Sequence, residues 1–234
     1  YSLPGLWVQP KLTYVPLSAI KLELGLHALV FNGANKYPCY VYHDIATWKG
    51  NQYQKGAHVL PWVRAQAQFK HLTVVLGNLY GGQQHGFTDA LWNAEANLSQ
   101  DPEMGFQLLW DRPRLHADTW LNWQSYIYEE DTHQEAFTVG STWRIHLGDT
   151  ASAFQWHLPV QLVVQHRGGE QDLTEMGVQT ISNAYAGIAF DWLSRRRALT
   201  QLGAEIGVQA AYQQSRKLWP FDTGLAVSAT ARAT

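Results

Sequence analysis

The sequence predicts an all-β chain that folds as an antiparallel transmembrane β-barrel. Three observations support this: long segments in which apolar and polar residues alternate, connections that are alternately short and long, and aromatic residues near segment ends. Residues 20–31 alternate best, because every second residue is apolar while Lys21, Glu23 and His27 occupy the other face. At about 3.3 Å per residue this segment spans on the order of 40 Å, which is long for a soluble strand and sufficient to cross a bilayer.

The composition agrees with a membrane protein that crosses by strands. The chain has 234 residues, of which 46% are hydrophobic and 15% charged, with 11 Trp, 11 Tyr and a formal net charge of -2. The sequence contains no run of 18 uncharged apolar residues, which is the pattern that would predict a transmembrane helix. The lone Cys39 permits no internal disulfide, and the only basic cluster, residues 195–197, is too small for a nucleic-acid footprint. We expect a single domain over residues 1–234.

Eleven alternating segments follow one another along the chain. They are residues 6–14, 20–31, 59–69, 72–76, 104–110, 115–127, 137–147, 154–164, 184–192, 202–212 and 225–233. The longest connections are residues 32–57 and 77–102, and no apolar face carries Asp, Glu, Lys, Arg or His. Pro10, Pro61 and Pro159 fall inside segments. Because proline cannot donate to a strand ladder, each should mark a bulge or a frayed end.

A soluble β-sandwich would also alternate, with its apolar face packed inward. The uniform length of the segments, the regular change between short and long connections, and the aromatic residues on the apolar face favour a barrel. The aromatic residues of the apolar face that lie beside short turns are Tyr14, Phe69, Trp110, Phe154, Trp156 and Trp192. Phe137 and Tyr212 lie toward the long connections, as a second aromatic girdle would require. We therefore expect the apolar face to contact lipid.

This pattern resembles the bacterial outer-membrane porin-type β-barrels. The resemblance covers nearly the whole chain and rests on the pattern of strands and turns, without a signature motif. It implies a place in the bacterial outer membrane, with short turns facing the periplasm and long loops facing outside. Such barrels usually have an even number of strands and periplasmic termini. The complete protein is therefore expected to have at least twelve strands, with one or more missing before Tyr1.

The inward face supplies the candidate functional residues. The predicted pore-lining residues are Lys11, Lys21, Glu23, Arg64, Gln66, Gln68, Asp118, Trp120, Asn122, Arg144, Glu205 and Gln209. Their balanced charges indicate either a transverse field across a hydrated channel or salt bridges that close a small lumen. Trp7, Trp62 and Trp120 also point inward, where they could stack on sugars or pack beneath an inward-folded loop.

A constriction loop is predicted within residues 77–102. Phe87, Leu91 and Trp92 form an apolar stripe at helical spacing, and such a stripe needs cover. We expect these three side chains to pack against the inner wall or the neighbouring long loop. The GGQQHG stretch before them is too permissive to identify a phosphate cradle.

These features favour an outer-membrane channel for passive or weakly selective passage of small hydrophilic solutes, sugars among them, with no enzyme activity, cofactor or metal. Outer-membrane lipid and the solutes are the expected partners. A second interpretation is a plugged barrel that serves as a structural or docking component for a surface lipoprotein or a transporter. A surface lipoprotein or a homo-oligomer is therefore a further expected partner. A third is an outer-membrane hydrolase with its residues near the long loops. The GxSxG and HExxH motifs are absent, and no nucleophile can be assigned to His116 and Asp118.

Overall fold

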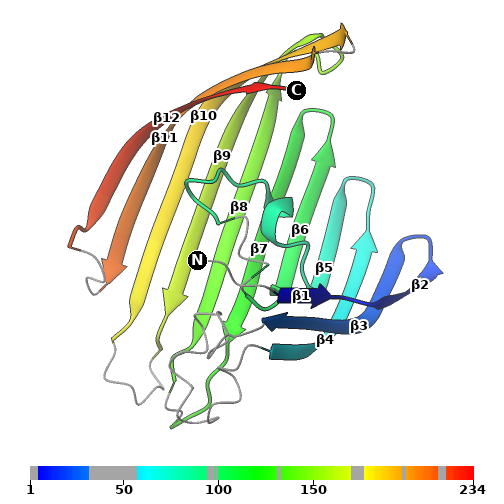
Figure 1. The fold of residues 1–234 in the computed structure, drawn as a ribbon, viewed down its shortest axis with the longest axis vertical. Helices are drawn as coiled ribbons and strands as arrows, with labels where there is room; N and C mark the ends of the chain where they lie inside the picture. Colours follow the sequence, from blue (N-terminus) through cyan, green and yellow to red (C-terminus); the bar gives the residue numbers. More distant parts are fainter. Residues whose placement is uncertain are drawn as a thin grey trace.

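The computed structural model describes residues 5–31, 57–93, 98, 100–130, 133–169, 177–196, 199–215 and 220–234. In this part of the chain, twelve antiparallel strands form one curved sheet (Figure 1). The strands are β1 (Gly5–Val8), β2 (Lys11–Leu17), β3 (Ile20–Phe31), β4 (Ala57–Gln68), β5 (Leu72–Asn78), β6 (Met104–Arg112), β7 (Leu115–Ser125), β8 (Ala136–Leu147), β9 (Phe154–Arg167), β10 (Gln179–Arg196), β11 (Leu199–Ser215) and β12 (Thr223–Ala233). From β3 onward each strand pairs with its neighbour in sequence. The predicted all-β antiparallel fold is confirmed.

The predicted first strand, residues 6–14, is wrong in one respect, because it consists of two strands. β1 pairs with residues 28–31 of β3 and β2 pairs with residues 20–25 of the same strand. Pro10 lies between them, and its carbonyl oxygen accepts a bond from the Leu26 backbone N–H at 3.1 Å. The ladder is interrupted here because proline has no N–H to donate. This break accounts for twelve strands where the alternation predicted eleven.

The other two prolines also lie where a ladder is incomplete. Pro159 occupies a gap in the pairing of β9 with β10, between the His157 and Val160 pairs. Pro61 is in register with β3, but the ladder between β4 and β5 begins only at Arg64. Each proline therefore sits where one missing N–H leaves no ladder bond broken.

The two faces of the sheet have the polarity that the alternation predicts. Large apolar side chains on the outer face are exposed, with Leu12 at 78% and Leu24 at 61% of their maximal accessible area. Polar side chains such as Glu23 and Arg64 are buried on the inner face. This arrangement is the reverse of a soluble sandwich, in which the apolar face is the buried one. A lipid-facing outer surface accounts for it.

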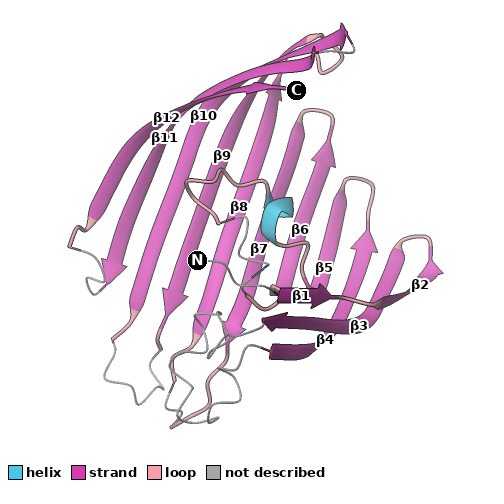
Figure 2. Cartoon of the chain, viewed as in Figure 1, coloured by secondary structure: helices cyan, strands magenta, loops and turns pink. Residues whose placement is uncertain are grey.

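The connection between β5 and β6 crosses the inner face of the sheet, as Figure 2 shows. The described part of this connection contains a short 3-10 helix, η3 (Gly82–His85). The helical stripe expected to include Phe87, Leu91 and Trp92 forms only a turn, in which the Leu91 and Trp92 N–H groups bond to the Thr88 carbonyl. Residues 32–56, the other long connection, lie outside the described part of the chain. None of the helices within the described ranges is long and apolar enough to cross a membrane.

Candidate functional site

Polar side chains that are almost fully buried line the inner face of the sheet. Those on the strands and on the β5–β6 connection are Glu23, His27, Arg64, Asn78, His85, Gln107, Asp118, Asn122, Thr138, His157, Gln161, Asp191 and Gln213. A buried polar group is destabilising unless it is hydrogen-bonded. The hydrogen-bond partners of these residues therefore show which polar groups hold the interior together and which could take part in a reaction.

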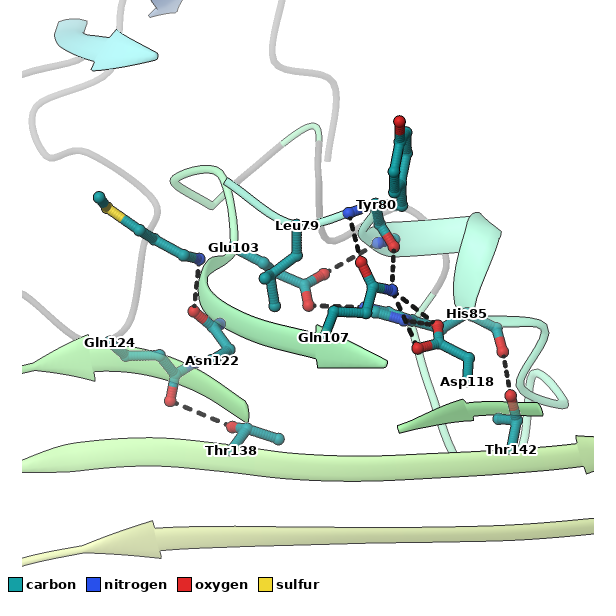
Figure 3. Close-up of polar contacts among 12 residues, drawn as sticks. Leu79, Tyr80, His85, Glu103, Gln107, Asp118, Asn122, Gln124, Thr138 and Thr142 are labelled. Atoms are coloured by element: carbon teal, nitrogen blue, oxygen red, sulfur yellow. Dashed lines mark hydrogen bonds and ion pairs between the residues drawn. The ribbon is translucent and has the colours of Figure 1, made fainter. Parts of the chain in front are cut away.

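The His85 cluster comprises His85, Glu103, Gln107 and Asp118 (Figure 3). His85 ends η3, and its Nδ1 lies 2.6 Å from Asp118 Oδ2 while its Nε2 lies 2.8 Å from Glu103 Oε2. Gln107 Nε2 donates to both carboxylate oxygens of Asp118 at 2.9 Å, and its Oε1 accepts from the Tyr80 N–H at 2.9 Å. Adjacent strands β6 and β7 supply Gln107 and Asp118, so the wall of the sheet holds the connection at both Tyr80 and His85.

Two carboxylates keep His85 positively charged. Burial by itself lowers the pKa of this imidazole, but the hydrogen bonds and charges of Asp118 and Glu103 outweigh burial and raise the pKa from 6.5 to about 9. At neutral pH both ring nitrogens are therefore donors, and each is bonded to a carboxylate. A general base needs a nitrogen lone pair directed at the proton that it removes. His85 is suited to fasten the connection and is not suited to abstract a proton.

A second anchor, the Arg64 guanidinium, holds the beginning of the same connection. It donates to the carbonyl oxygens of Asn78 and Leu79 at 2.6 Å each and to Glu23 Oε2 at 3.0 Å. The Tyr80 ring covers the guanidinium at 3.8 Å from its centroid. Arginine offers several donors in a rigid planar fork, which allows one side chain to bind two carbonyl groups and a carboxylate. The β5–β6 connection is thus fastened at both Arg64 and His85.

Aromatic rings pack the space between the connection and the wall. The Trp92 ring lies 5.3 Å and the Phe87 ring 6.3 Å from Trp120 on β7, and His85 stacks on Trp120 at 4.2 Å. The sequence predicts that Phe87, Leu91 and Trp92 pack against the inner wall or the neighbouring long loop, and Phe87 and Trp92 do contact Trp120 of that wall. The expectation that Trp120 lines an open pore is wrong, because these rings cover it and leave only 1% of its surface exposed.

A cavity of about 820 Å³ lies between the connection and strands β6 to β12. Beside it is the Asp191 cluster, in which Asp191 contacts His157 at 3.5 Å, Arg144 at 3.2 Å and Arg232 at 3.3 Å. Arg232 also lies 3.8 Å from Glu205, so in this wall two arginines balance two carboxylates. Among the described residues, no group of three or more His, Cys, Asp or Glu side chains is arranged to hold a metal ion.

A smaller cavity of about 260 Å³ lies on the side of the connection nearer β1 to β4. Trp7, Lys11 and Trp62 line it, and Gln84 borders both cavities. The Lys11 ammonium lies 4.4 Å from the centre of the Trp62 ring, a cation–π contact that covers one face of the indole. The Arg64 guanidinium lies 5.0 Å from the centre of the same ring, and Trp62 is only 5% exposed, so its ring is not free to stack on a sugar.

The twelve predicted pore-lining residues lie on the inner face, but they do not surround one open passage. Arg64 and Asp118 bind the inward-folded connection and Glu23 binds Arg64, whereas Arg144 and Glu205 line the larger cavity. Two more of the predicted pore-lining residues contact Tyr80 of the connection. The Tyr80 hydroxyl bonds to Gln66 at 2.7 Å and lies 3.5 Å from Lys21 Nζ.

Reasoning from the sequence misses His85, Glu103 and Gln107. The inward position of Gln107 follows from the alternation of residues 104–110, and this signal could have placed it beside Asp118. No local pattern marks His85 or Glu103, because both lie in an irregular connection.

Comparison with known protein families matches residues 1–234 to the lipid A 3'-O-deacylase-type family. Since the match spans the whole chain, the chain belongs to this family. No curated protein and no solved structure matches it. The family overturns two expectations from the sequence, namely the solute channel and the absence of enzyme activity. It agrees with the third interpretation, an outer-membrane hydrolase.

Proposed function

We propose that this protein is an outer-membrane hydrolase that removes an ester-linked acyl chain from lipid A. The observation that carries the proposal is the match of residues 1–234 to the lipid A 3'-O-deacylase-type family. A deacylase of this kind adds water across the ester bond and releases a fatty acid and a sugar hydroxyl.

The exposed apolar face supports this proposal, because it suits a protein that lies in the same bilayer as its substrate. Side chains such as Leu24 and Val59 are more than half exposed on the outer face. A lipid reaches an enzyme in the membrane by lateral diffusion along that face, so the substrate does not need an open lumen. The β5–β6 connection, which is fastened at Arg64 and at His85, agrees with an interior that serves as a scaffold.

Ester hydrolysis places chemical demands on the site. A base must take a proton from water or from a side-chain hydroxyl, and donors must stabilise the oxyanion of the tetrahedral intermediate. His85 does not meet the first demand because carboxylates occupy both of its nitrogens. The base is therefore expected among the histidines that keep a lone pair.

Purified protein refolded in detergent micelles with lipid A tests the proposal. We expect mass spectrometry to show lipid A that has lost one acyl chain, together with an equal amount of free fatty acid. Heat-unfolded protein and lipid A that already lacks its 3'-linked chain are the controls, and neither should yield fatty acid. Intact lipid A after prolonged incubation with folded protein would overturn the proposal.

A further inference from the structure

A row of cross-strand neighbours runs over the outer face at the long-loop ends of the strands. Trp123 on β7 pairs with Phe137 on β8, Phe137 pairs with His166 on β9, and His166 pairs with Thr180 on β10. His166 lies on the same face of β9 as Leu162, which is 45% exposed. The row therefore combines exposed aromatic surface with an imidazole and a hydroxyl group.

The position of His166 along β9 places this row at a membrane interface. Trp156, beside the short turn, contacts Phe190 at 4.9 Å on the outer face, and His166 follows ten residues later on the same face. Ten residues of a tilted strand span about 25 Å along the membrane normal, which is the height of the apolar band of an outer-membrane barrel. The Trp156 level then marks one interface and the His166 level marks the other, on the side of the long loops. In barrels of this class that side faces outward.

The hydrogen bonds of His166 determine which ring nitrogen carries the proton. Its Nε2 lies 2.8 Å from the Gly168 carbonyl oxygen, which can only accept, so Nε2 must carry hydrogen. In the neutral ring Nδ1 then has a lone pair, and it lies 2.8 Å from Thr180 Oγ1. The Thr180 hydroxyl therefore donates to Nδ1. A hydroxyl bonded to a base whose other nitrogen is oriented by a third group is the arrangement that activates a nucleophile.

We propose that Thr180 is the nucleophile and His166 the general base of the deacylation, at a site on the lipid-facing surface; this inference rests on the proposed function. Both side chains are half-buried, and neither belongs to the His85 or the Asp191 cluster. The exposed apolar side chain of Leu162 lies on the same face, and Val178, which is also exposed, directly precedes β10. They offer a surface along which an acyl chain can lie while its ester reaches Thr180.

The reaction proceeds in two balanced halves. Thr180 Oγ attacks the ester carbonyl carbon while His166 Nδ1 takes the hydroxyl proton, and the collapsing intermediate expels the sugar oxygen, which receives that proton. An acyl ester on Thr180 remains. Water then attacks the acyl carbon and gives a proton to His166 Nδ1. Release of the fatty acid returns the proton to Thr180 Oγ, so no external reductant, oxidant or metal is consumed.

A structural role for the same bonds is the alternative, since His166 also ties the end of β9 to the turn at Gly168. Two readouts separate the roles. The first is acyl release from lipid A by wild type, Thr180→Ser, Thr180→Val and His166→Gln. The second is covalent labelling by a long-chain alkyl fluorophosphonate, located by peptide mass spectrometry. Thr200→Val is the matched control, because Thr200 is exposed at the short-turn end and bonds only to the terminal Thr234 carbonyl.

We expect His166→Gln and Thr180→Val to lower the rate of acyl release by about 100-fold or more, the usual scale for loss of a general base. Thr180→Ser should stay within about tenfold of wild type, because it keeps the hydroxyl, and Thr200→Val should match wild type. The fluorophosphonate should label Thr180 in wild type but no residue in Thr180→Val. Heat-modifiable migration on gels confirms that each variant is folded.

The outcomes separate the two proposals. Absence of acyl release from wild type overturns the proposed function, while labelling still reports on Thr180 independently. Acyl release by a folded Thr180→Val variant at the wild-type rate overturns the assignment of the nucleophile and leaves the proposed function standing. Labelling of a residue other than Thr180 overturns the assignment as well.

Discussion

Two histidines of this protein each have both ring nitrogens hydrogen-bonded, yet they are prepared for opposite tasks. His85 lies inside the sheet between two carboxylates, and His166 lies on the outer face between a carbonyl oxygen and a hydroxyl group. Carboxylates can only accept, so both nitrogens of His85 carry protons and the ring is a buried cation. The hydroxyl can donate, so one nitrogen of His166 keeps its lone pair.

The comparison shows that the partners of an imidazole decide its role more directly than its burial does. Two neighbouring carboxylates give the imidazole of His85 a structural role as a cation. Removing its proton would leave the negative charges of the two carboxylates without a cation between them. A carbonyl and a hydroxyl place no anion beside the ring, and they fix which tautomer the neutral ring adopts. The inner face thus carries the His85 cation, which holds the β5–β6 connection, and the lipid-facing surface carries His166, the imidazole suited to proton transfer.

Removing the inner cation should have the largest effect on stability. His85→Ala leaves Glu103 and Asp118 buried without their partner and is expected to lower the free energy of unfolding by about 3–5 kcal/mol. Urea unfolding of the refolded protein in micelles measures this. His116→Ala is the control, because the His116 and Asp111 pair is 51% and 83% exposed and is worth about 1 kcal/mol or less. Equal losses of unfolding free energy in the two variants would contradict the structural role of the His85 cation.

The stabilisation that protonated His85 contributes should also depend on pH. The pKa of His85 is raised from 6.5 to about 9, so the folded protein holds a proton that the unfolded chain releases. This stabilisation is complete below about pH 6.5 and is lost as the pH rises through about 9. It amounts to about 3 kcal/mol. Unfolding of wild type and His85→Gln between pH 6 and pH 10 should converge at the alkaline end, and parallel curves would refute the assignment.

On the outer face, charge should be tolerated poorly at the middle of the apolar band. Leu24→Arg is expected to cost about 2–4 kcal/mol, the range for an arginine at the bilayer midplane of a barrel. Lys21→Gln, on the inner face of the same strand, removes a partly exposed ion pair with Glu23 and should cost about 1 kcal/mol or less. Comparable costs at the two positions in lipid vesicles would mean that the outer face does not contact lipid.

The smallest effect is expected where a glycine makes room for an indole. A Cβ atom at Gly140 would meet the ring of Trp120 on the neighbouring strand, so Gly140→Ala should cost about 1–3 kcal/mol through overpacking. A Cβ atom at Gly224 would lie 3.6 Å from Ala211 Cβ, which is an ordinary contact. Gly224→Ala should therefore leave the unfolding midpoint unchanged. Near-ultraviolet circular dichroism of the buried indole provides a second readout for the Gly140 variant.

The sequence by itself determined the strands and their faces, because period-two alternation is a local property of an extended chain. Residues 20–31 match β3, and Lys21 and Leu24 lie on the predicted sides. The break at Pro10 also follows from a local cause, the missing N–H, although its consequence, two strands in place of one, depends on how each half pairs with β3.

Only the tertiary structure decided where the chemistry-bearing groups meet. His85 and Asp118 are 33 residues apart, and the path of an irregular connection brings them to 2.6 Å. His166 and Thr180 are 14 residues apart and become neighbours because β9 and β10 pair in one particular register. Alternation fixes the side of the sheet on which a residue lies but leaves the register free by steps of two residues. A shift of two would keep every face correct and separate Thr180 from His166.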